Sequence, residues 1–237
     1  MVKLLKLKKK EPDNNKLMNC LDNLHPMLSF EMEKWDDGII FIAGIDEVGR
    51  GPIAGPVVAA AVIFDKNKDI PVVDDSKKLT EKKRNIYYKN IIKTDNIQYS
   101  VAEVDVDLID EINILQATHL AMKKAVSELP NVEFALIDGL PVKNFTLPNT
   151  AIVKGDSKSA SIAAASIIAK VYRDNLMIKY SLEYPEYSFE KNKGYGTVEH
   201  LNAIKKYGPC PIHRKSFAPV SDYYIVDKKI QQKFKFE

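Results

Sequence analysis

The sequence feature that most constrains the fold is an apolar run that ends in two carboxylates and leads into a glycine-rich turn. Residues 39–46, IIFIAGID, are apolar and largely β-branched up to Asp46, which Glu47 follows. Such a run is typical of a buried strand. Glycines and prolines at 49–56 then predict a tight turn, and residues 57–64, VVAAAVIF, predict a second strand. The pattern therefore favours a β-hairpin with an acidic pair at its turn.

The rest of the chain alternates between strand-like and helix-like patterns. Strands are predicted at 96–104, 134–138 and 151–153, and helices at 79–93, 108–129, about 157–180 and 197–207. Thr80 is the expected N-cap of the first helix, and Pro130 closes the second. The third helix begins with a stretch of alanine and serine, and small residues let a helix lie close to its neighbour. Together these elements predict an α/β fold with a mixed sheet flanked by helices.

Length and composition limit the class of protein. The chain has 237 residues, which fits one compact domain with extensions. No apolar run reaches the roughly 18 residues of a membrane span. Cys20 and Cys210 stand far apart, so neither a disulfide framework nor a structural zinc site is expected. We therefore expect a cytoplasmic protein that does not contact a membrane.

Charge is distributed unevenly along the chain. Residues 1–138 carry 19 Lys/Arg against 23 Asp/Glu, and residues 139–237 carry 16 against 9. An acidic half followed by a basic half suits an anionic substrate held over a metal site. Solvated surface charge together with a lysine-rich tail explains the same counts, so charge alone does not decide.

Carboxylates follow two of the predicted buried strands. Asp46 and Glu47 end the first strand, and Asp138 ends the strand 134–138. Carboxylates at neighbouring strand ends can meet at one sheet edge, where their mutual repulsion would be relieved by a divalent cation. Oxygen ligands without His or Cys suit Mg²⁺ or Mn²⁺. A single Asp is more often a turn former or helix cap, so the clustering carries this hypothesis.

Two further positions stay open on the residues alone. Asp156 precedes the long helix and could simply cap it, whereas Asp174 lies inside it. At ~1.5 Å rise per residue the two lie about 27 Å apart, so both cannot reach one site. The Gly49–Gly55 turn is one residue too long for a dinucleotide fingerprint and precedes a strand. Its backbone N–H groups and Arg50 could instead contact a sugar hydroxyl or a phosphate.

Six segments, in order, carry a family resemblance. They are GIDEVGRGPIAGPVVAAAVI (44–63), DSKKL (75–79), LIDG (136–139), KGDSKSASIAAASIIAKVYRD (154–174), NKGYGTVEH (192–200) and GPCPIHRKSF (208–217). Together they resemble bacterial type 2 ribonuclease H, the ribonuclease HII family, over roughly residues 44–220. The resemblance implies a ribonuclease H-like mixed five-stranded sheet with a helical C-terminal part. The lysine-rich pattern up to residue 37 predicts an extension of unassigned role, and the core is expected to start at Gly38. With the resemblance, this predicts a catalytic domain over 38–220 and a basic tail at 221–237.

The same resemblance implies an activity and its residues. The implied enzyme is a metal-dependent endonuclease that cuts the RNA strand of RNA–DNA hybrids, and cuts 5′ of ribonucleotides embedded in duplex DNA, leaving 5′-phosphate and 3′-hydroxyl ends. Two Mg²⁺ or Mn²⁺ ions would be held by the family's acidic quartet, which falls on Asp46, Glu47, Asp138 and Asp156. The residues implied to contact the ribonucleotide's 2′-hydroxyl are Gly49, Arg50 and Gly51, and Tyr195 would pack on the next deoxyribose.

A non-catalytic module that binds RNA–DNA hybrids is the alternative, and a nucleotide-dependent transferase is disfavoured because no phosphate-cradling loop precedes a helix. His119, His200 and His213 are expected to be structural. Lysines 143, 154, 158 and 170 are candidate phosphate contacts, although none is individually specific. We expect a monomer.

Overall fold

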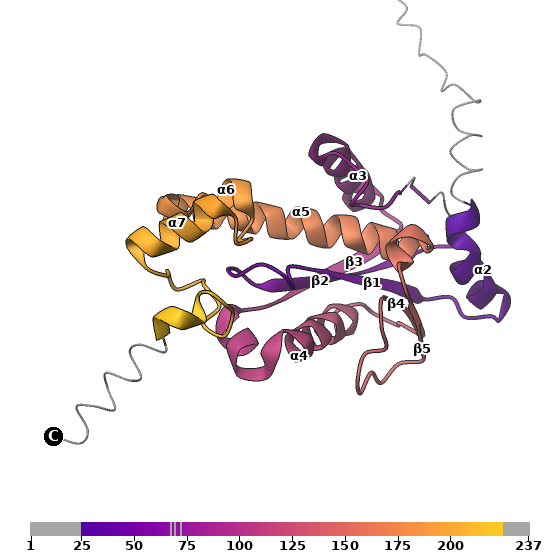
Figure 1. Cartoon of the computed structure of the whole chain (residues 1–237). Coiled ribbons are helices and arrows are strands. Elements are labelled where there is room, and N and C mark those ends of the chain that lie inside the picture. The colour runs from indigo at the N-terminus through magenta and orange to yellow at the C-terminus, as the bar shows by residue number, and fades with distance from the viewer. Residues whose placement is uncertain (1–24, 67, 69, 72, 225–237) are drawn as a thin grey trace, which may run out of the picture.

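The computed structural model describes residues 25–66, 68, 70–71 and 73–224. Its centre is a five-stranded sheet with the strand order β3-β2-β1-β4-β5 (Figure 1). The strands are β1 (Ile42–Val48), β2 (Val57–Phe64), β3 (Ile97–Val104), β4 (Phe134–Asp138) and β5 (Asn149–Ile152). β1, β2 and β3 pair antiparallel, whereas β4 runs parallel to both β1 and β5. This arrangement confirms the predicted mixed five-stranded sheet.

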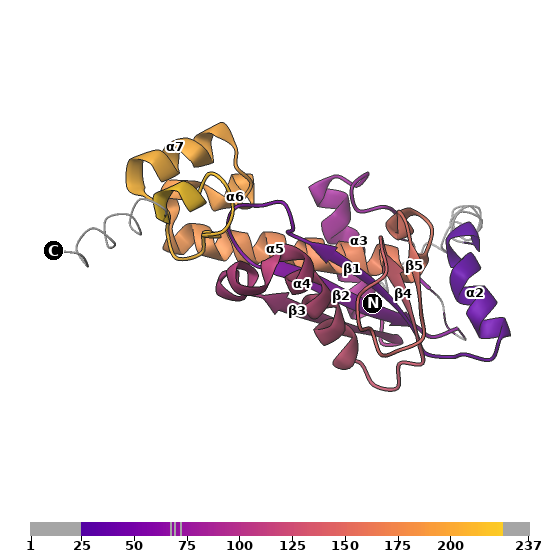
Figure 2. The same ribbon diagram turned by 60° about the horizontal axis from the view of Figure 1, so that its bottom comes forward.

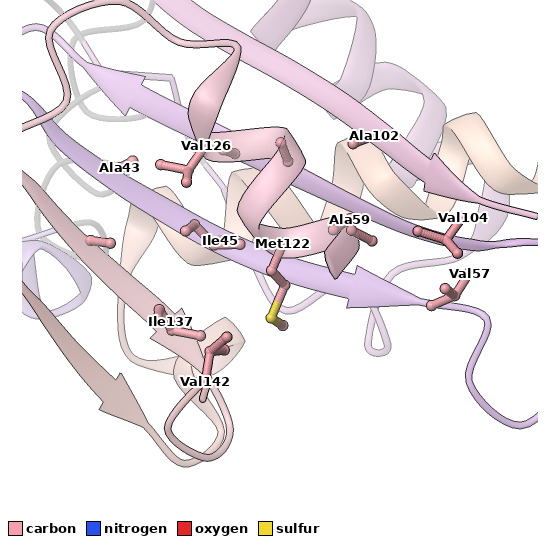
Figure 3. Packing of buried hydrophobic residues seen from close by; sticks show 14 of the residues in the cluster. Ala43, Ile45, Val57, Ala59, Ala102, Val104, Met122, Val126, Ile137 and Val142 are labelled. Carbon is pink, nitrogen blue, oxygen red and sulfur yellow. The ribbon is translucent and has the colours of Figure 1, made fainter. Parts of the chain in front are cut away.

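Helices cover both faces of the sheet, with α5 (Ala160–Glu183) on one side and α4 (Val106–Ser127) on the other (Figure 1). Every residue of β2 is buried, as expected of a strand that packs on both faces. In the neighbouring strand β1, the alternate residues Ala43 and Ile45 point towards α4, where Met122 and Val126 complete one core (Figure 3). The other face of β2 packs on the alanine-rich part of α5.

α5 (Ala160–Glu183) begins later than the sequence predicts. Its N-cap is Ser159, whose side chain accepts a hydrogen bond from the N–H of Ile162. Asp156 lies instead in a preceding 3₁₀ turn, Gly155–Ser157, so it does not cap this helix. The small residues do allow close approach, because a Cβ placed on Gly44 of β1 would overlap the backbone of Ser161.

Two other helices follow their predicted positions closely. α3 (Glu81–Lys93) has the expected N-cap, since the Thr80 side chain accepts a hydrogen bond from the N–H of Lys83. α4 (Val106–Ser127) starts two residues earlier than predicted and is kinked at Asn113, where φ is +68°. The Asn113 side chain accepts hydrogen bonds from the N–H groups of Leu115 and Gln116, which caps the second part of the helix.

A short helical segment precedes the sheet, formed by η1 (His25–Leu28) and α2 (Ser29–Asp36). Glu31 of α2 is buried, and its Oε1 accepts hydrogen bonds from Ser159 Oγ (2.6 Å), Ser161 N (3.0 Å) and Ser161 Oγ (2.6 Å). α2 is thus attached to the first turn of α5. Part of the predicted extension 1–37 therefore packs directly on the core.

The helical C-terminal part lies at the end of α5 opposite to α2 (Figure 2). It contains η3 (Pro185–Tyr187), α6 (Phe189–Asn192) and α7 (Val198–Tyr207). These pack around a separate apolar cluster that includes Ile53, Met177 and Phe189. Ile53 belongs to the loop between β1 and β2, so this cluster joins that loop to the C-terminal part.

Some expectations concern residues beyond the described ranges. Residues 1–24, which include Cys20, and residues 225–237, which hold the lysines of the predicted basic tail, lie outside the described residues. Over the residues that are described, no helix is long and apolar enough to cross a membrane.

Candidate active site

Strand register brings the predicted carboxylates together. Ile45 of β1 pairs with Ile137 of β4 in a parallel ladder, so the next residues, Asp46 and Asp138, lie side by side. Glu47 follows at the end of β1. One carboxylate oxygen from each of Asp46, Glu47 and Asp138 lies within 4.8 Å of the others. The sequence-based expectation that two strand ends would converge is therefore met in the structure.

Burial and mutual repulsion perturb all three carboxyl groups. Asp46 is almost fully buried, and its pKa is raised well above the usual value, first by burial and then by the charges of Glu47 and Asp138. The pKa of Glu47 is raised by burial, although nearby Arg50 opposes the shift. The pKa of Asp138 is also raised, by burial and by the charge of Asp156. A cation in this cluster would relieve the repulsion.

Asp156 is held next to this cluster by the 3₁₀ turn Gly155–Ser157. The N–H of Gly155 donates to Asp138 Oδ1 at 2.6 Å, and a Cβ at Gly155 would lie 2.7 Å from Ile162 Cδ1. Asp156 is buried, and its Oδ2 accepts a hydrogen bond from Lys77 Nζ at 2.6 Å. Lys77, which was not predicted as a site residue, therefore places its ammonium group beside the acidic cluster. Its position within the DSKKL segment was the available signal.

Asp174 lies elsewhere and has partners of its own. Its carboxylate forms ion pairs with Lys170 Nζ at 2.7 Å and with Arg84 at 4.0 Å. The choice between Asp156 and Asp174 thus favours Asp156 as the neighbour of Asp138. Lys143, Lys154 and Lys158 are exposed, whereas Lys170 is engaged with Asp174.

The glycine-rich segment is a loop rather than the predicted tight turn. Residues 49–56 leave β1 and pack against the chain near residue 213, where Ala54 forms a bridge with His213. Gly49 has φ +93°, and a Cβ there would overlap the Arg173 side chain. Any larger residue would therefore be strained at this position. The loop is shaped by contacts with residues distant in sequence, which local turn signals do not report.

Gly51 of this loop lies against the Tyr195 ring. A Cβ at Gly51 would lie 3.5 Å from Tyr195 Cε1. Tyr195 is 46% exposed, so its ring faces solvent and is not folded into the C-terminal core. Arg50, 51% exposed at its side chain, lies 3.3 Å from Glu47 Oε1. The loop thus contacts the acidic cluster through Arg50 and Tyr195 through Gly51.

Two buried arginines hold the loop, and sequence reasoning missed both. Arg173 donates to the carbonyls of Ala54, Pro56 and Lys193. Arg214 donates to the carbonyls of Gly49, Arg50 and Gly55. Both side chains are fully buried. Their presence in two of the six quoted segments, 154–174 and 208–217, was the only signal for them.

Comparison with known proteins identifies the family. The family model described as Ribonuclease HII matches residues 43–220. The chain is 52% identical over 198 residues to Ribonuclease HII of Caldanaerobacter subterraneus subsp. tengcongensis, covering 83% of this chain and 82% of that protein. It is 53% identical over 198 residues to Ribonuclease HII of Endomicrobium trichonymphae, covering 83% and 94%.

The fold agrees with a solved structure. The ribonuclease H2 of Pyrococcus horikoshii OT3 superimposes with a TM-score of 0.66 at 27% identity, covering 80% of this chain and all of that one. A family model that matches most of the chain, relatives about half identical to it and a shared fold all point to the same family. The chain therefore belongs to the ribonuclease HII family of endoribonucleases.

Proposed function

We propose that this protein is an endonuclease that hydrolyses the RNA strand of RNA–DNA hybrids and cuts on the 5′ side of ribonucleotides embedded in duplex DNA. The observation that carries the proposal is the convergence of Asp46, Glu47 and Asp138 within 4.8 Å beside the loop that begins at Gly49, in which Arg50 and Gly51 are exposed. Membership of the ribonuclease HII family supports the choice of substrate.

The donor set fits Mg²⁺ or Mn²⁺. The cluster offers carboxylate oxygens and no imidazole or thiolate, which is the ligand chemistry these ions prefer. Asp46, Glu47 and Asp138 would hold the ions, and Asp156 would complete the site from its 3₁₀ turn. Two such ions supply an activated water and stabilisation of the departing oxygen in phosphodiester hydrolysis, leaving 5′-phosphate and 3′-hydroxyl ends. The residues' part is to fix the ligand oxygens in place.

Lys77 has a defined part in this account. Its ammonium group lies 2.6 Å from Asp156 Oδ2, and the carboxylates of Asp156, Asp46 and Asp138 all act to raise its pKa. It therefore stays protonated and holds the Asp156 carboxylate in one orientation. Its side chain is 73% exposed, which leaves the ammonium group accessible to substrate phosphate as well.

Recognition of the ribonucleotide is assigned to the loop and the tyrosine. A 2′-hydroxyl is the one group that separates RNA from DNA. The carbonyls of Gly49 and Arg50 accept hydrogen bonds from Arg214, so the backbone N–H groups of Gly49, Arg50 and Gly51 are the groups assigned to this contact. The absence of a Cβ at Gly51 allows a close approach. Tyr195, against Gly51, would pack on the adjacent deoxyribose. The two together would read a junction of RNA and DNA.

A non-catalytic hybrid-binding module is the competing function. Burying three mutually repelling carboxylates raises the pKa of each and costs folding free energy. A module that only binds hybrid gains nothing from that cost, so the cluster favours catalysis.

One assay distinguishes the two. A duplex carrying a single ribonucleotide, labelled at the 5′ end of that strand, is incubated with the protein in Mg²⁺ and in EDTA. Catalysis predicts a shortened labelled strand only in Mg²⁺. Retention of the intact duplex in a gel shift, without cleavage in either Mg²⁺ or Mn²⁺, would instead establish the binding module.

A further inference from the structure

The two parts of the proposed substrate-reading surface are both attached to one dipeptide, His213–Arg214. The loop that carries Gly49–Gly51 follows β1, whereas Tyr195 lies between α6 and α7, more than 140 residues later. Their relative position must therefore be set by contacts that join the two segments. Arg173 is one such link, because it donates to the carbonyls of Ala54, Pro56 and Lys193. A second set of links passes through residues 210–214.

Arg214 fixes the glycine loop. Its side chain is fully buried, with Nη1 donating to the carbonyl of Arg50 at 3.0 Å and Nη2 donating to the carbonyl of Gly49. Nε and Nη2 also donate to the carbonyl of Gly55, at 3.0 and 2.8 Å. The rigid planar fork of a guanidinium can satisfy three carbonyls in this way, whereas a lysine ammonium cannot match the geometry.

His213 is connected to Tyr195 through His200. The Nδ1 atom of His200 lies 2.8 Å from the carbonyl oxygen of Tyr195. A carbonyl only accepts, so this nitrogen carries the proton. Burial lowers the pKa of His200 and keeps the ring neutral, so its Nε2 is an acceptor. Because His213 Nε2 lies 3.0 Å away, it must be the donor.

The remaining nitrogen of His213 completes the chain. Its Nδ1 lies 2.9 Å from the Cys210 nitrogen, 3.1 Å from the Cys210 sulfur and 3.2 Å from the Cys210 carbonyl oxygen. With the proton on Nε2, Nδ1 accepts from the Cys210 N–H and thiol, and the contact with the carbonyl is not a hydrogen bond. The opposite tautomer of His213 would place two lone pairs face to face between the rings. Both histidines are fully buried, and burial raises the pKa of the Cys210 thiol to about 12, so the thiol is protonated. The group is therefore a hydrogen-bonded chain of fixed direction.

Backbone hydrogen bonds join the same three segments. The N–H of Arg214 donates to the carbonyl of Ile53 at 2.9 Å, and the N–H of Gly55 donates to the carbonyl of Ile212 at 2.8 Å. The N–H of Ile53 then donates to the carbonyl of Gly194 at 2.9 Å. The glycine loop is thus held between residues 212–214 on one side and the Tyr195 loop on the other.

We propose that His213 and Arg214 are positioning residues that set the distance between the Gly49–Gly51 backbone and the Tyr195 ring. His213 acts through His200 on the Tyr195 carbonyl, and Arg214 acts directly on the Gly49 and Arg50 carbonyls. The proposal rests on the proposed function for the claim that these groups read the substrate. It assigns neither residue a contact with substrate, since both side chains are fully buried.

The first test needs no activity. Hydrogen–deuterium exchange is measured on the full chain for the parent, Arg214→Lys, His213→Gln and the control Ile204→Ala. Ile204 is buried in the apolar cluster of the C-terminal part, with Ile53 and Phe189, but it forms none of the hydrogen bonds described above. Arg214→Lys should speed exchange in residues 49–56, and His213→Gln in 192–197, beyond the change seen in Ile204→Ala. If all three variants change these segments equally, the residues merely stabilise the fold and the proposal is wrong.

The second test uses the ratio of two activities. The variants are compared for kcat/KM on a duplex with one ribonucleotide and on a continuous RNA–DNA hybrid. Misplacing the reading groups by about 1 Å should lower the junction value relative to the hybrid value on the order of tenfold or more, while Ile204→Ala keeps the parent ratio. An unchanged ratio in both His213→Gln and Arg214→Lys would overturn the proposal. A parent that cuts neither duplex would refute the proposed function, and exchange would still decide the positioning.

A third measurement uses only the parent protein, so it tests the proposal even where the variants fail to fold. Long-range ¹H–¹⁵N spectra of the imidazoles report the tautomer of each histidine. The hydrogen-bonded chain from Cys210 to Tyr195 requires the proton on Nδ1 of His200 and on Nε2 of His213. The reverse assignment for either ring would overturn the connection to Tyr195.

Discussion

Asp46 and Asp138 occupy equivalent positions on two parallel neighbouring strands, one residue beyond the register pair Ile45 and Ile137. This relationship, rather than proximity in sequence, creates the acidic cluster. It places two carboxyl groups at the same sheet edge, where burial and then the charges of Glu47 and Asp138 raise the pKa of Asp46. The consequences for activity and for stability can be tested separately.

Substitution of the central carboxylates should abolish cleavage without unfolding the protein. Asp46→Asn and Asp138→Asn each remove a proposed ligand, and Mg²⁺-dependent cleavage should fall by several orders of magnitude because ion position and charge compensation are both lost. Asp156→Asn should also lose activity. Asp174→Asn is the matched control, since Asp174 pairs with Lys170 and Arg84. An inactive Asp174→Asn beside an active Asp156→Asn would contradict the assigned quartet.

Asp46→Asn should stabilise the metal-free protein, and the gain in unfolding free energy should depend on pH. The pKa of Asp46 is raised above the reference value of 3.8 in the folded state. Below that value the carboxyl is neutral in both states and costs nothing. As pH rises through the folded pKa the buried charge appears and stability is lost. Urea unfolding in EDTA should therefore show Asp46→Asn to be more stable than the parent near pH 8.

The difference between the two proteins should shrink towards pH 4, where both carry a neutral group at position 46. Mg²⁺ should raise the stability of the parent more than that of the variant, because it binds the folded state through the intact cluster. An Asp46→Asn protein no more stable than the parent at pH 8 would show that burial and the neighbouring carboxylates do not penalise the charged form of Asp46 in the folded state.

The strands and the acidic ends could be read from the sequence because both signals are local. Alternation and apolar runs locate β1 and β4, and Asp46 and Asp138 directly follow those runs. The register that joins them is not local, and no single sequence reports it. For the same reason Lys77 was missed, since its partner Asp156 lies 79 residues away.

The loop at 49–56 shows where local reasoning fails. Glycine and proline predict a tight turn, yet Arg214 and Arg173 hold the segment open as a longer loop. Asp156 is a second example. An Asp before a helix predicts an N-cap, but Ser159 takes that position and leaves Asp156 free to approach Asp138. In both cases a distant partner overrides the local preference.

Glu31 should be a major stabilising residue of the α2 segment. Its Oε1 accepts three hydrogen bonds from Ser159 and Ser161, so Glu31→Ala leaves buried donors unpaired and should cost about 3 kcal/mol of unfolding free energy. Glu33→Ala is the matched control on the same helix, because the Glu33 side chain is 64% exposed and its ion pair is with Lys34. This substitution should cost less than about 0.5 kcal/mol. Equal losses in urea unfolding would contradict the attachment.

Tyr195 and Gly51 should affect junction cleavage more than duplex binding. Phosphate contacts dominate affinity, so Tyr195→Ala should leave binding nearly unchanged while slowing cleavage at a lone ribonucleotide. At position 51 a Cβ would lie 3.5 Å from Tyr195 Cε1, which is ordinary contact. Gly51→Ala should therefore be mild, whereas the branched side chain of Gly51→Val should displace the ring and slow cleavage. Junction cleavage by Tyr195→Ala at the parent rate would show that the ring does not read the sugar.

The central claim is that the surface formed by the acidic cluster, the Gly49–Gly51 loop and Tyr195 cuts where RNA meets DNA. Mapping the cut position in matched duplexes, one all-DNA and one with a single ribonucleotide, tests it most directly. In Mg²⁺ we expect one cut on the 5′ side of the ribonucleotide, with 5′-phosphate and 3′-hydroxyl ends, and an intact all-DNA duplex. Cleavage of the all-DNA duplex, or cleavage that continues in EDTA, would contradict the account.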